Sequence, residues 1–261
     1  MKESPGSMRK SFKRVPALDK CFQILEFSAQ SKIPLSITNI SNKLGFHKST
    51  ISSIIYTLED LGVLENDGDK KFRLGTKLYE LAKAASENFG LIHTIHPYLE
   101  EINKKTKLSV FLGIRLGLDV VVVDKVESTF DVKISADIGT RYPLLGGAAG
   151  KALLSQLSDA EIDEILSKNK LKRFTRYTCV HKKKCKEMIT MVRQEGVAIS
   201  NEEYVEGVRA LAVPLKIRRW NFPITIWMIG LKSQINDKNF ISYSNLLKEA
   251  AKKIEVLFSV G

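Results

Sequence analysis

The sequence contains only three cysteines and no long uninterrupted hydrophobic run. A transmembrane helix needs about 20 consecutive apolar residues, so a membrane-spanning protein is not expected. The first fourteen residues are polar and lack the apolar core of a secretory signal. Cys21, Cys179 and Cys185 are too few to form the disulfide framework of a small secreted domain. These absences predict a cytoplasmic protein without a membrane anchor.

Acidic residues are also scarce relative to basic ones. The 261 residues include 41 Lys and Arg against 29 Asp and Glu, which gives a net charge of +12. Such a surplus favours a polyanionic partner, either nucleic acid or, less often, an anionic membrane surface. The length favours two domains. Nine of the basic residues and no acid lie in residues 168–186, which form either a basic surface near DNA or a solvated face.

Residues 1–14 combine five Lys and Arg with Pro5, Gly6 and three serines. This composition cannot form a core and predicts a flexible basic arm, either a solvated tail or a segment that contacts phosphate. Helical spacing begins near Leu18, with Leu18, Phe22, Ile24 and Leu25 on one face.

Two short amphipathic helices follow, and Gly45 separates them. The apolar stripe of the first helix ends before Gly45, which is placed as a left-handed C-cap, and a second stripe runs to Gly62. The stripes contain Ile37, Ile40 and Leu44, and then Ile51, Ile54, Ile55, Leu58 and Leu61. Two such helices joined by a tight turn predict a helix-turn-helix. A hairpin around Asp67-Gly68-Asp69 follows and predicts a wing, so residues 15–75 form a winged helix-turn-helix domain.

The polar face of the second helix has little negative charge. A helix that enters the major groove of a double-stranded DNA operator needs short polar side chains and no acids, because acids repel phosphates. We expect base reading by Lys48, Ser49, Thr50, Ser52 and Ser53, and phosphate contact by Lys70, Lys71 and Arg73. Two alternatives remain open: a helical hairpin capped by a surface turn, and a module that uses this face to bind protein.

The rest of the chain predicts an α+β domain behind a linker helix. Residues 76–90 have helical spacing, and residues 91–261 contain β-branched runs at 108–138 followed by helices. Ser158 and Glu161 form a capping box that opens one helix, and another helix begins near Asn239. Strands joined by short turns indicate an antiparallel sheet.

Catalytic, metal and cofactor sites are not expected. The run GGAAGKA at 146–152 has the wrong spacing for a phosphate loop, and Ala152 stands where a magnesium-binding hydroxyl is required. His93 and His96 lack a third ligand at useful spacing, and Cys179, His181 and Cys185 offer only three ligands at unfamiliar spacing. No cysteine–histidine or paired-carboxylate arrangement is evident, so an enzyme is not expected.

The motifs in their order resemble the IclR family of transcription regulators, from about Val15 to Val260. The resemblance rests on LGFHKSTISSIIYTLEDLGVL and FRLG in the first part, and on IGTRYPLLGGAAGKALLSQL, LKRFTRYT and VRQEGVAISNEEYVEGVRALAVPL in the second. It implies a winged helix-turn-helix, a linker helix and a GAF-like effector-binding domain, an antiparallel sheet flanked by helices. It also implies a homodimer or tetramer that answers to a small-molecule effector.

The resemblance also places an effector pocket. Its positions fall on Leu145, Ala148, Ala149, Ser200, Ala210, Trp227 and Ile229. This chain departs from the family at several of these positions. The family often has His where this chain has Leu145 and Cys where it has Ala210. It often has polar residues at the positions of Trp227 and Ile229. The family also usually has Arg at Ser53, so the operator cannot be transferred. Fewer polar groups make a small hydrophilic acid a poor ligand. We expect an organic acid with an apolar or aromatic body, or a pocket that Trp227 fills with no ligand.

Overall fold

The computed structural model describes residues 15–31, 33–217, 220 and 222–259, and the chain divides into two compact units, Met1–Phe89 and Gly90–Gly261. The basic arm predicted at residues 1–14 lies outside the described residues. None of the described helices is long and apolar enough to cross a membrane.

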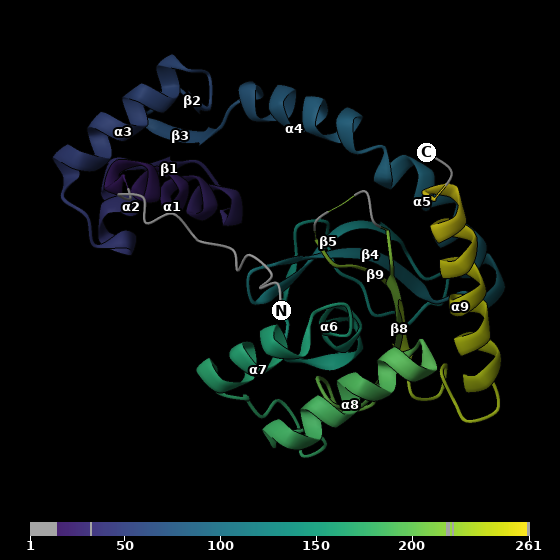
Figure 1. Ribbon diagram of the computed structural model, residues 1–261. Helices are drawn as coiled ribbons and strands as arrows, with labels where there is room; N and C mark the ends of the chain where they lie inside the picture. Colours follow the sequence, from purple (N-terminus) through teal and green to yellow (C-terminus); the bar gives the residue numbers. More distant parts are fainter. Residues whose placement is uncertain (1–14, 32, 218–219, 221, 260–261) are drawn as a thin grey trace, which may run out of the picture. The chain divides into compact units, whose positions relative to one another are not determined.

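The first unit is a winged helix-turn-helix (Figure 1). Its strands form one small antiparallel sheet in the order β1-β3-β2. Strand β1 is absent from the sequence prediction, because only Leu35 and Ser36 contribute to it. The elements are α1 (Pro16–Gln30), β1 (Leu35–Ser36), α2 (Ile37–Leu44), α3 (Lys48–Asp60), β2 (Leu64–Asn66), β3 (Lys71–Leu74) and α4 (Thr76–Phe89).

Local signals in the sequence explain the bounds of α2 and α3. Ser36 caps α2 by accepting a hydrogen bond from the Asn39 backbone amide, and the Asn39 side chain accepts one from the Ser36 backbone. Gly45 ends α2 with a left-handed φ of 71°, which confirms its predicted role. The buried sides of the helices then pack with β2 and β3 in one core that includes Ile24, Ile40, Ile51, Ile55, Leu58, Leu64 and Phe72.

The predicted apolar face of α1 is only partly used in this core. Ile24 is fully buried, whereas Leu18 and Phe22 are 59% and 64% exposed. The helix predicted from this spacing is present, but its apolar residues do not all reach the core. Within the first unit, these two side chains remain on the surface.

The second unit is built on a six-stranded antiparallel sheet in the order β6-β5-β4-β9-β8-β7. Two long hairpin-like pairs, β4 with β5 and β8 with β9, form most of it. The elements are α5 (Leu91–Thr106), β4 (Ser109–Leu116), β5 (Asp119–Val126), β6 (Arg141–Pro143), α6 (Gly147–Leu154), α7 (Asp159–Lys168), α8 (Lys182–Glu195), β7 (Ala198–Asn201), β8 (Val208–Leu215), β9 (Ile224–Leu231) and α9 (Phe240–Leu257).

Helices cover both faces of this sheet (Figure 1). Because side chains alternate across a strand, Val110 and Leu112 of β4 pack on the side of α5 and α9, whereas Phe111 packs on the side of α6, α7 and α8. Two hydrophobic cores result, one on each face. The predicted capping box is confirmed, since Ser158 and Glu161 cap α7 reciprocally.

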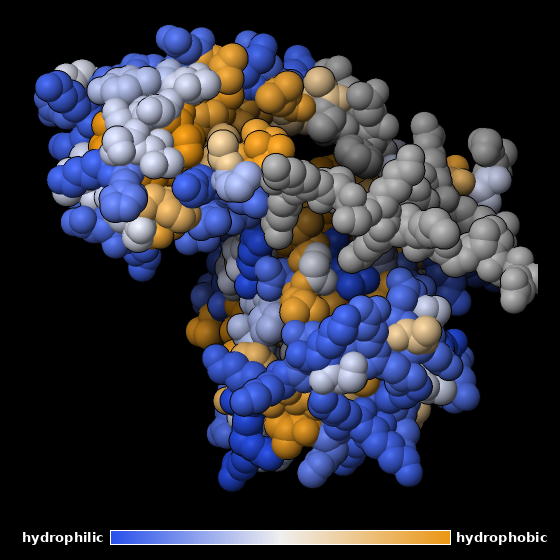
Figure 2. Space-filling view, turned by 60° about the vertical axis from the view of Figure 1, so that its left-hand side comes forward, coloured by the Kyte–Doolittle hydropathy of each residue, from blue (hydrophilic) through white to orange (hydrophobic). Residues whose placement is uncertain are grey.

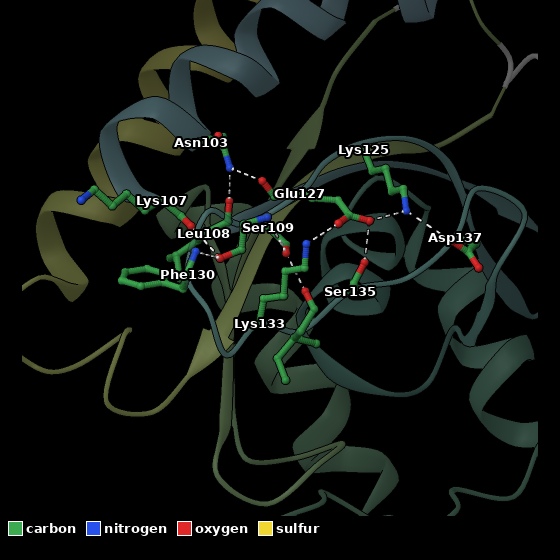
Figure 3. A network of polar contacts seen from close by, with 12 residues as sticks. Asn103, Lys107, Leu108, Ser109, Lys125, Glu127, Phe130, Lys133, Ser135 and Asp137 are labelled. Atoms are coloured by element: carbon green, nitrogen blue, oxygen red, sulfur yellow. Dashed lines mark hydrogen bonds and ion pairs between the residues drawn. The ribbon is translucent and has the colours of Figure 1, made fainter.

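Residues 132–138, predicted as a strand, are not one. The sheet pairs β5 with β6 instead, and the intervening loop is fixed by side chains (Figure 3). The Ser109 hydroxyl donates to the Ile134 carbonyl at 2.5 Å, and Glu127 accepts from Lys133 at 2.6 Å and from Ser135 at 3.0 Å. Side-chain hydrogen bonds from Ser109 and Glu127, which lie outside this segment, therefore replace the ladder that its β-branched residues would otherwise favour.

Candidate nucleic-acid interface and ligand cavity

Helix α3 exposes the face on which base reading was predicted. Lys48, Ser49 and Ser53 are exposed, and Thr50 and Ser52 are half-buried. The opposite face buries Ile51, Ile55 and Leu58 in the core. The first turn contains no acid, and the N-cap residue His47 makes no side-chain capping bond, so the first backbone N–H groups stay available to an anion. From Lys48 to Leu58 the helix therefore presents hydrogen-bonding groups without negative charge, and its two acids, Glu59 and Asp60, lie at its C-terminal end.

The wing presents two unpaired cations and one paired cation. Lys70 and Lys71 are exposed and have no carboxylate partner among the described residues. Arg73 instead lies 3.4 Å from Glu65, whose pKa is lowered mainly by a backbone hydrogen bond from Thr76. Part of the positive charge predicted for the wing is thus neutralised on the protein itself.

A cavity of about 160 Å³ opens in the second unit between α6, the sheet and the loop after β7. Six of the seven predicted effector positions line it, and Leu145 does not. Leu145 instead lines a separate small cavity beside Cys179 and Cys185. The lining residues are Ile134, Tyr142, Gly146, Gly147, Ala148, Ala149, Ser200, Tyr204, Val205, Val208, Ala210, Trp227 and Ile229.

The polar groups of the cavity gather at the beginning of α6. Gly146 is the N-cap without a side-chain cap, and no acid lies in the first turn, so the first N–H groups of α6 carry an uncompensated positive partial charge. Gly147 has a φ of 73°, a conformation that favours glycine. A Cβ at Gly147 would lie 3.9 Å from the hydroxyl of Ser200, a residue that is only 4% exposed. A carboxylate can therefore be bound here by backbone amides and one hydroxyl.

The remaining walls are apolar and aromatic. Trp227 is buried and stacks on Phe111, with ring centroids 5.1 Å apart. Gly113 makes room for the indole, because a Cβ there would lie 2.6 Å from Trp227 Cζ3. Tyr142 and Tyr204 meet edge to face at 5.9 Å, and burial raises the pKa of Tyr142. The sequence pattern singled out none of Gly113, Tyr142 and Tyr204; the only available signal was a glycine within the β-branched run of β4.

The loop that carries Tyr204 and Val205 is fastened from several sides. Thr175 donates to the Glu202 carbonyl and Thr178 to the Glu203 carbonyl, each at 2.7 Å. Glu203 also pairs with Lys151 of α6 at 2.7 Å, with both side chains largely buried. Two threonine hydroxyls and the Glu203–Lys151 ion pair therefore hold the backbone of this loop beside the cavity.

No group of three or more His, Cys, Asp and Glu side chains within the described ranges is arranged to hold a metal ion. His96 forms a different interaction, in which Nδ1 lies 2.8 Å from Asp124 Oδ2.

The first unit thus has the architecture of a DNA reader, and the second encloses a ligand-sized cavity. Together they define a class of protein: DNA-binding regulators with a winged helix-turn-helix and a separate sensor domain.

Comparisons with known proteins identify the family. Residues 17–68 match the IclR helix-turn-helix domain, and residues 83–256 match the bacterial transcriptional regulator IclR C-terminal domain. The chain is 30% identical to the HTH-type transcriptional regulator KdgR of Dickeya chrysanthemi, over 92% of this chain and 79% of that protein. The chain belongs to the IclR family of transcriptional regulators. Its relatives are named as regulators and not as enzymes.

Solved structures share the fold. An IclR regulator from Alicyclobacillus acidocaldarius matches with a TM-score of 0.81 at 22% identity, over 94% of this chain and 99% of that one. An IclR homologue from Microbacterium hydrocarbonoxydans, crystallised with 4-hydroxybenzoate, also matches with a TM-score of 0.81, at 20% identity over 94% of this chain and all of that one. The predicted fold class, a winged helix-turn-helix followed by a GAF-like domain with a flanked antiparallel sheet, is confirmed.

Proposed function

We propose that this DNA-binding regulator reads its operator through Lys48, Ser49, Thr50, Ser52 and Ser53 of α3, with Lys70, Lys71 and Arg73 contacting phosphates. The observation that carries the proposal is the polar face of α3 opposite its buried apolar stripe, which contains no acid from Lys48 to Leu58. Short hydroxyl side chains reach base edges in the major groove. Lysines on the wing can contact the phosphates of the neighbouring DNA backbone.

The proposed effector is an organic acid with an apolar or aromatic body. Its carboxylate would lie at the N-terminus of α6 beside Ser200, and its body against Trp227, Ile229 and Val208. The cavity of about 160 Å³ suits one aromatic ring, since an apolar cavity of about 150 Å³ binds benzene. The structural neighbour that binds 4-hydroxybenzoate supports this class of ligand.

The competing possibility is a pocket that Trp227 fills. Against it stands the open cavity beside the indole, which is held against Phe111 and Gly113. Isothermal titration calorimetry with 4-hydroxybenzoate and with glyoxylate tests the ligand class. We expect the aromatic acid to bind and glyoxylate to bind far more weakly. Tight glyoxylate binding would contradict the proposed class, and binding of neither acid would favour the filled pocket.

A homodimer or tetramer is part of the proposal. Leu18 and Phe22 are exposed on α1, and a second copy of the chain would remove these apolar side chains from water. Size-exclusion chromatography with light scattering gives the oligomeric state, and Leu18→Ser with Phe22→Ser tests whether this face contributes to it.

The experiment that tests operator reading is fluorescence anisotropy with DNA from the protein's own promoter and with scrambled DNA, over a salt series. Sequence-specific reading predicts a preference for the promoter that persists at physiological salt. Equal binding to both duplexes, lost at moderate salt, would contradict the proposal. If the protein binds neither duplex at any salt concentration, the alternative is favoured in which the helix-turn-helix face binds another protein.

A further inference from the structure

The positive charge of the chain is concentrated away from the reading helix. Residues 15–75 contain seven Lys and Arg and seven Asp and Glu, so the winged helix-turn-helix is neutral overall. Residues 168–186 contain nine Lys and Arg and no acid, three quarters of the net charge of +12. These nineteen residues belong to the second unit, where they run from the end of α7 into α8.

The structure shows which of these cations are not neutralised within the protein. Lys168, Arg176 and Lys186 have acidic partners in Glu164, Glu206 and Asp163. The other exposed cations have no carboxylate partner among the described residues. Five of them are named here the basic corner: Lys170, Lys172, Arg173, Lys183 and Lys184.

The basic corner lies where the end of α7 and the beginning of α8 meet. The Lys182 ammonium donates to the Ser167 carbonyl at 3.0 Å, and Lys186 bonds Asp163 of α7 at 2.6 Å. These two contacts bring the ends of the helices together, and the loop between them carries Lys170, Lys172 and Arg173. Figure 1 shows this loop joining α7 to α8, and the visible face of residues 90–261 in Figure 2 is mostly hydrophilic.

This charge distribution opposes folding and is therefore not explained by stability. The first turn of α8 contains Lys182, Lys183 and Lys184 and no acid, and the N-cap residue His181 makes no side-chain cap. Cations at a helix N-terminus are repelled by the helix dipole. In contrast, α7 begins with Asp159 and Glu161, the charges that a helix N-terminus favours. An external anion would relieve this repulsion in α8.

We propose that the basic corner is a second DNA-contacting surface, which binds the phosphate backbone without reading sequence. A duplex carries one negative charge per about 1.7 Å, and a protein gains affinity by replacing its counterions with Lys and Arg. The neutral domain around α3 supplies few such cations, whereas the basic corner supplies five. Double-stranded DNA is the polyanion that a regulator of this family already meets. The inference goes beyond operator reading and does not depend on which residues of α3 contact bases.

The test measures binding of a fluorescein-labelled random-sequence duplex to the full chain over a salt series. The variant Lys170→Gln, Lys183→Gln, Lys184→Gln removes three cations whose side chains make no hydrogen bond or ion pair with the described residues, so the fold is expected to persist. Each lost phosphate contact reduces the slope of log affinity against log salt by about 0.9. We expect the slope to become shallower by about 2 to 3 and the affinity at low salt to fall by about tenfold or more.

A matched control removes the same charge elsewhere on the second unit. Lys104→Gln, Lys238→Gln, Lys252→Gln alters three exposed lysines of α5, the turn before α9, and α9 itself, on the other side of the sheet (Figure 1). We expect this variant to retain the slope of the unmodified protein. Equal losses in both variants would show an effect of net charge alone and would overturn the proposal, as would an unchanged slope in the first variant.

Two further arms separate this inference from its alternatives. In a Ser49→Glu, Thr50→Glu background, promoter preference is expected to disappear while the slope difference between the two lysine variants remains. Loss of that difference would overturn the basic corner as a separate surface.

A fluorescent oligoglutamate peptide tests an acidic protein partner. If the corner variant loses affinity for the peptide and keeps its affinity for the duplex, the assignment to DNA is wrong.

Discussion

The two units differ most in how charge and burial are distributed. Residues 15–75 carry equal numbers of basic and acidic residues around one small core, whereas the second unit has two cores, an internal cavity and the basic segment 168–186. In our proposals, hydrogen-bonding groups on α3 recognise sequence and cations elsewhere supply salt-sensitive attraction. The comparison teaches that specificity and electrostatic affinity can be carried by different parts of one chain.

The largest expected effect tests the first unit. Ser49→Glu with Thr50→Glu places two carboxylates on the proposed reading face of α3, where they would repel phosphates and lose base contacts. We expect promoter affinity to fall by about a thousandfold, to the level of non-specific binding. Fluorescence anisotropy measures the loss.

The control is Ser233→Glu with Ser242→Glu, two exposed serines of the second unit. These substitutions add the same charge away from α3 and should leave promoter preference intact. If the control loses as much affinity as the α3 variant, or if the α3 variant keeps its preference, the first unit does not read DNA through this face.

The next effect tests the second unit. Trp227→Ala removes a buried indole that stacks on Phe111, and it should lower the free energy of unfolding by about 3–5 kcal/mol. Urea denaturation followed by circular dichroism measures it. Trp220→Ala is the control, because Trp220 is half-buried at the margin of the other core and meets Phe258 edge to face, so its loss should cost less. If both substitutions lower the free energy of unfolding equally, Trp227 is not the buried support of the cavity wall that we infer.

A smaller effect of opposite sign is expected in α1. The Ser28 hydroxyl is buried without a hydrogen-bond partner in the described part of the chain. Ser28→Ala removes this unsatisfied group and should raise the stability of the first unit by about 1 kcal/mol. Thermal denaturation measures it, with Ser52→Ala in α3 as the control for helix propensity. A gain no larger than that of Ser52→Ala would mean that the hydroxyl carries no desolvation cost.

Local patterns in the sequence predicted the ends of helices better than they predicted which distant residues contact one another. Gly45 and the Ser158–Glu161 pair act within one helix end, so their roles can be recognised from neighbouring residues alone. The β-branched run at 132–138 was misjudged, because Ser109 and Glu127 bind that segment from elsewhere in the sequence. In the cavity, Gly113 matters only because Trp227 lies across it from another strand. Such long-range pairings leave no periodic signal in the sequence.

The smallest expected effect concerns the loop that carries Ile134 to the cavity. Glu127 accepts hydrogen bonds from Lys125, Lys133 and Ser135, in that order of importance, and these lower its pKa to about 2 (Figure 3). A lowered pKa in the folded state stabilises the protein above the unfolded pKa of about 4.3, and this contribution disappears as the pH falls from there towards 2.

Glu127→Gln should therefore flatten the loss of stability with acid in this pH window and leave stability near neutral pH slightly lower, because an exposed network contributes little. Denaturation curves between pH 2 and 7 measure this. Asp131→Asn is the control, since Asp131 lies in the same loop, is exposed and makes no ion pair among the described residues. If both variants keep the acid dependence of the unmodified protein, the Glu127 network does not hold the loop. The position of Ile134 beside the cavity must then depend on the Ser109 hydrogen bond to its carbonyl.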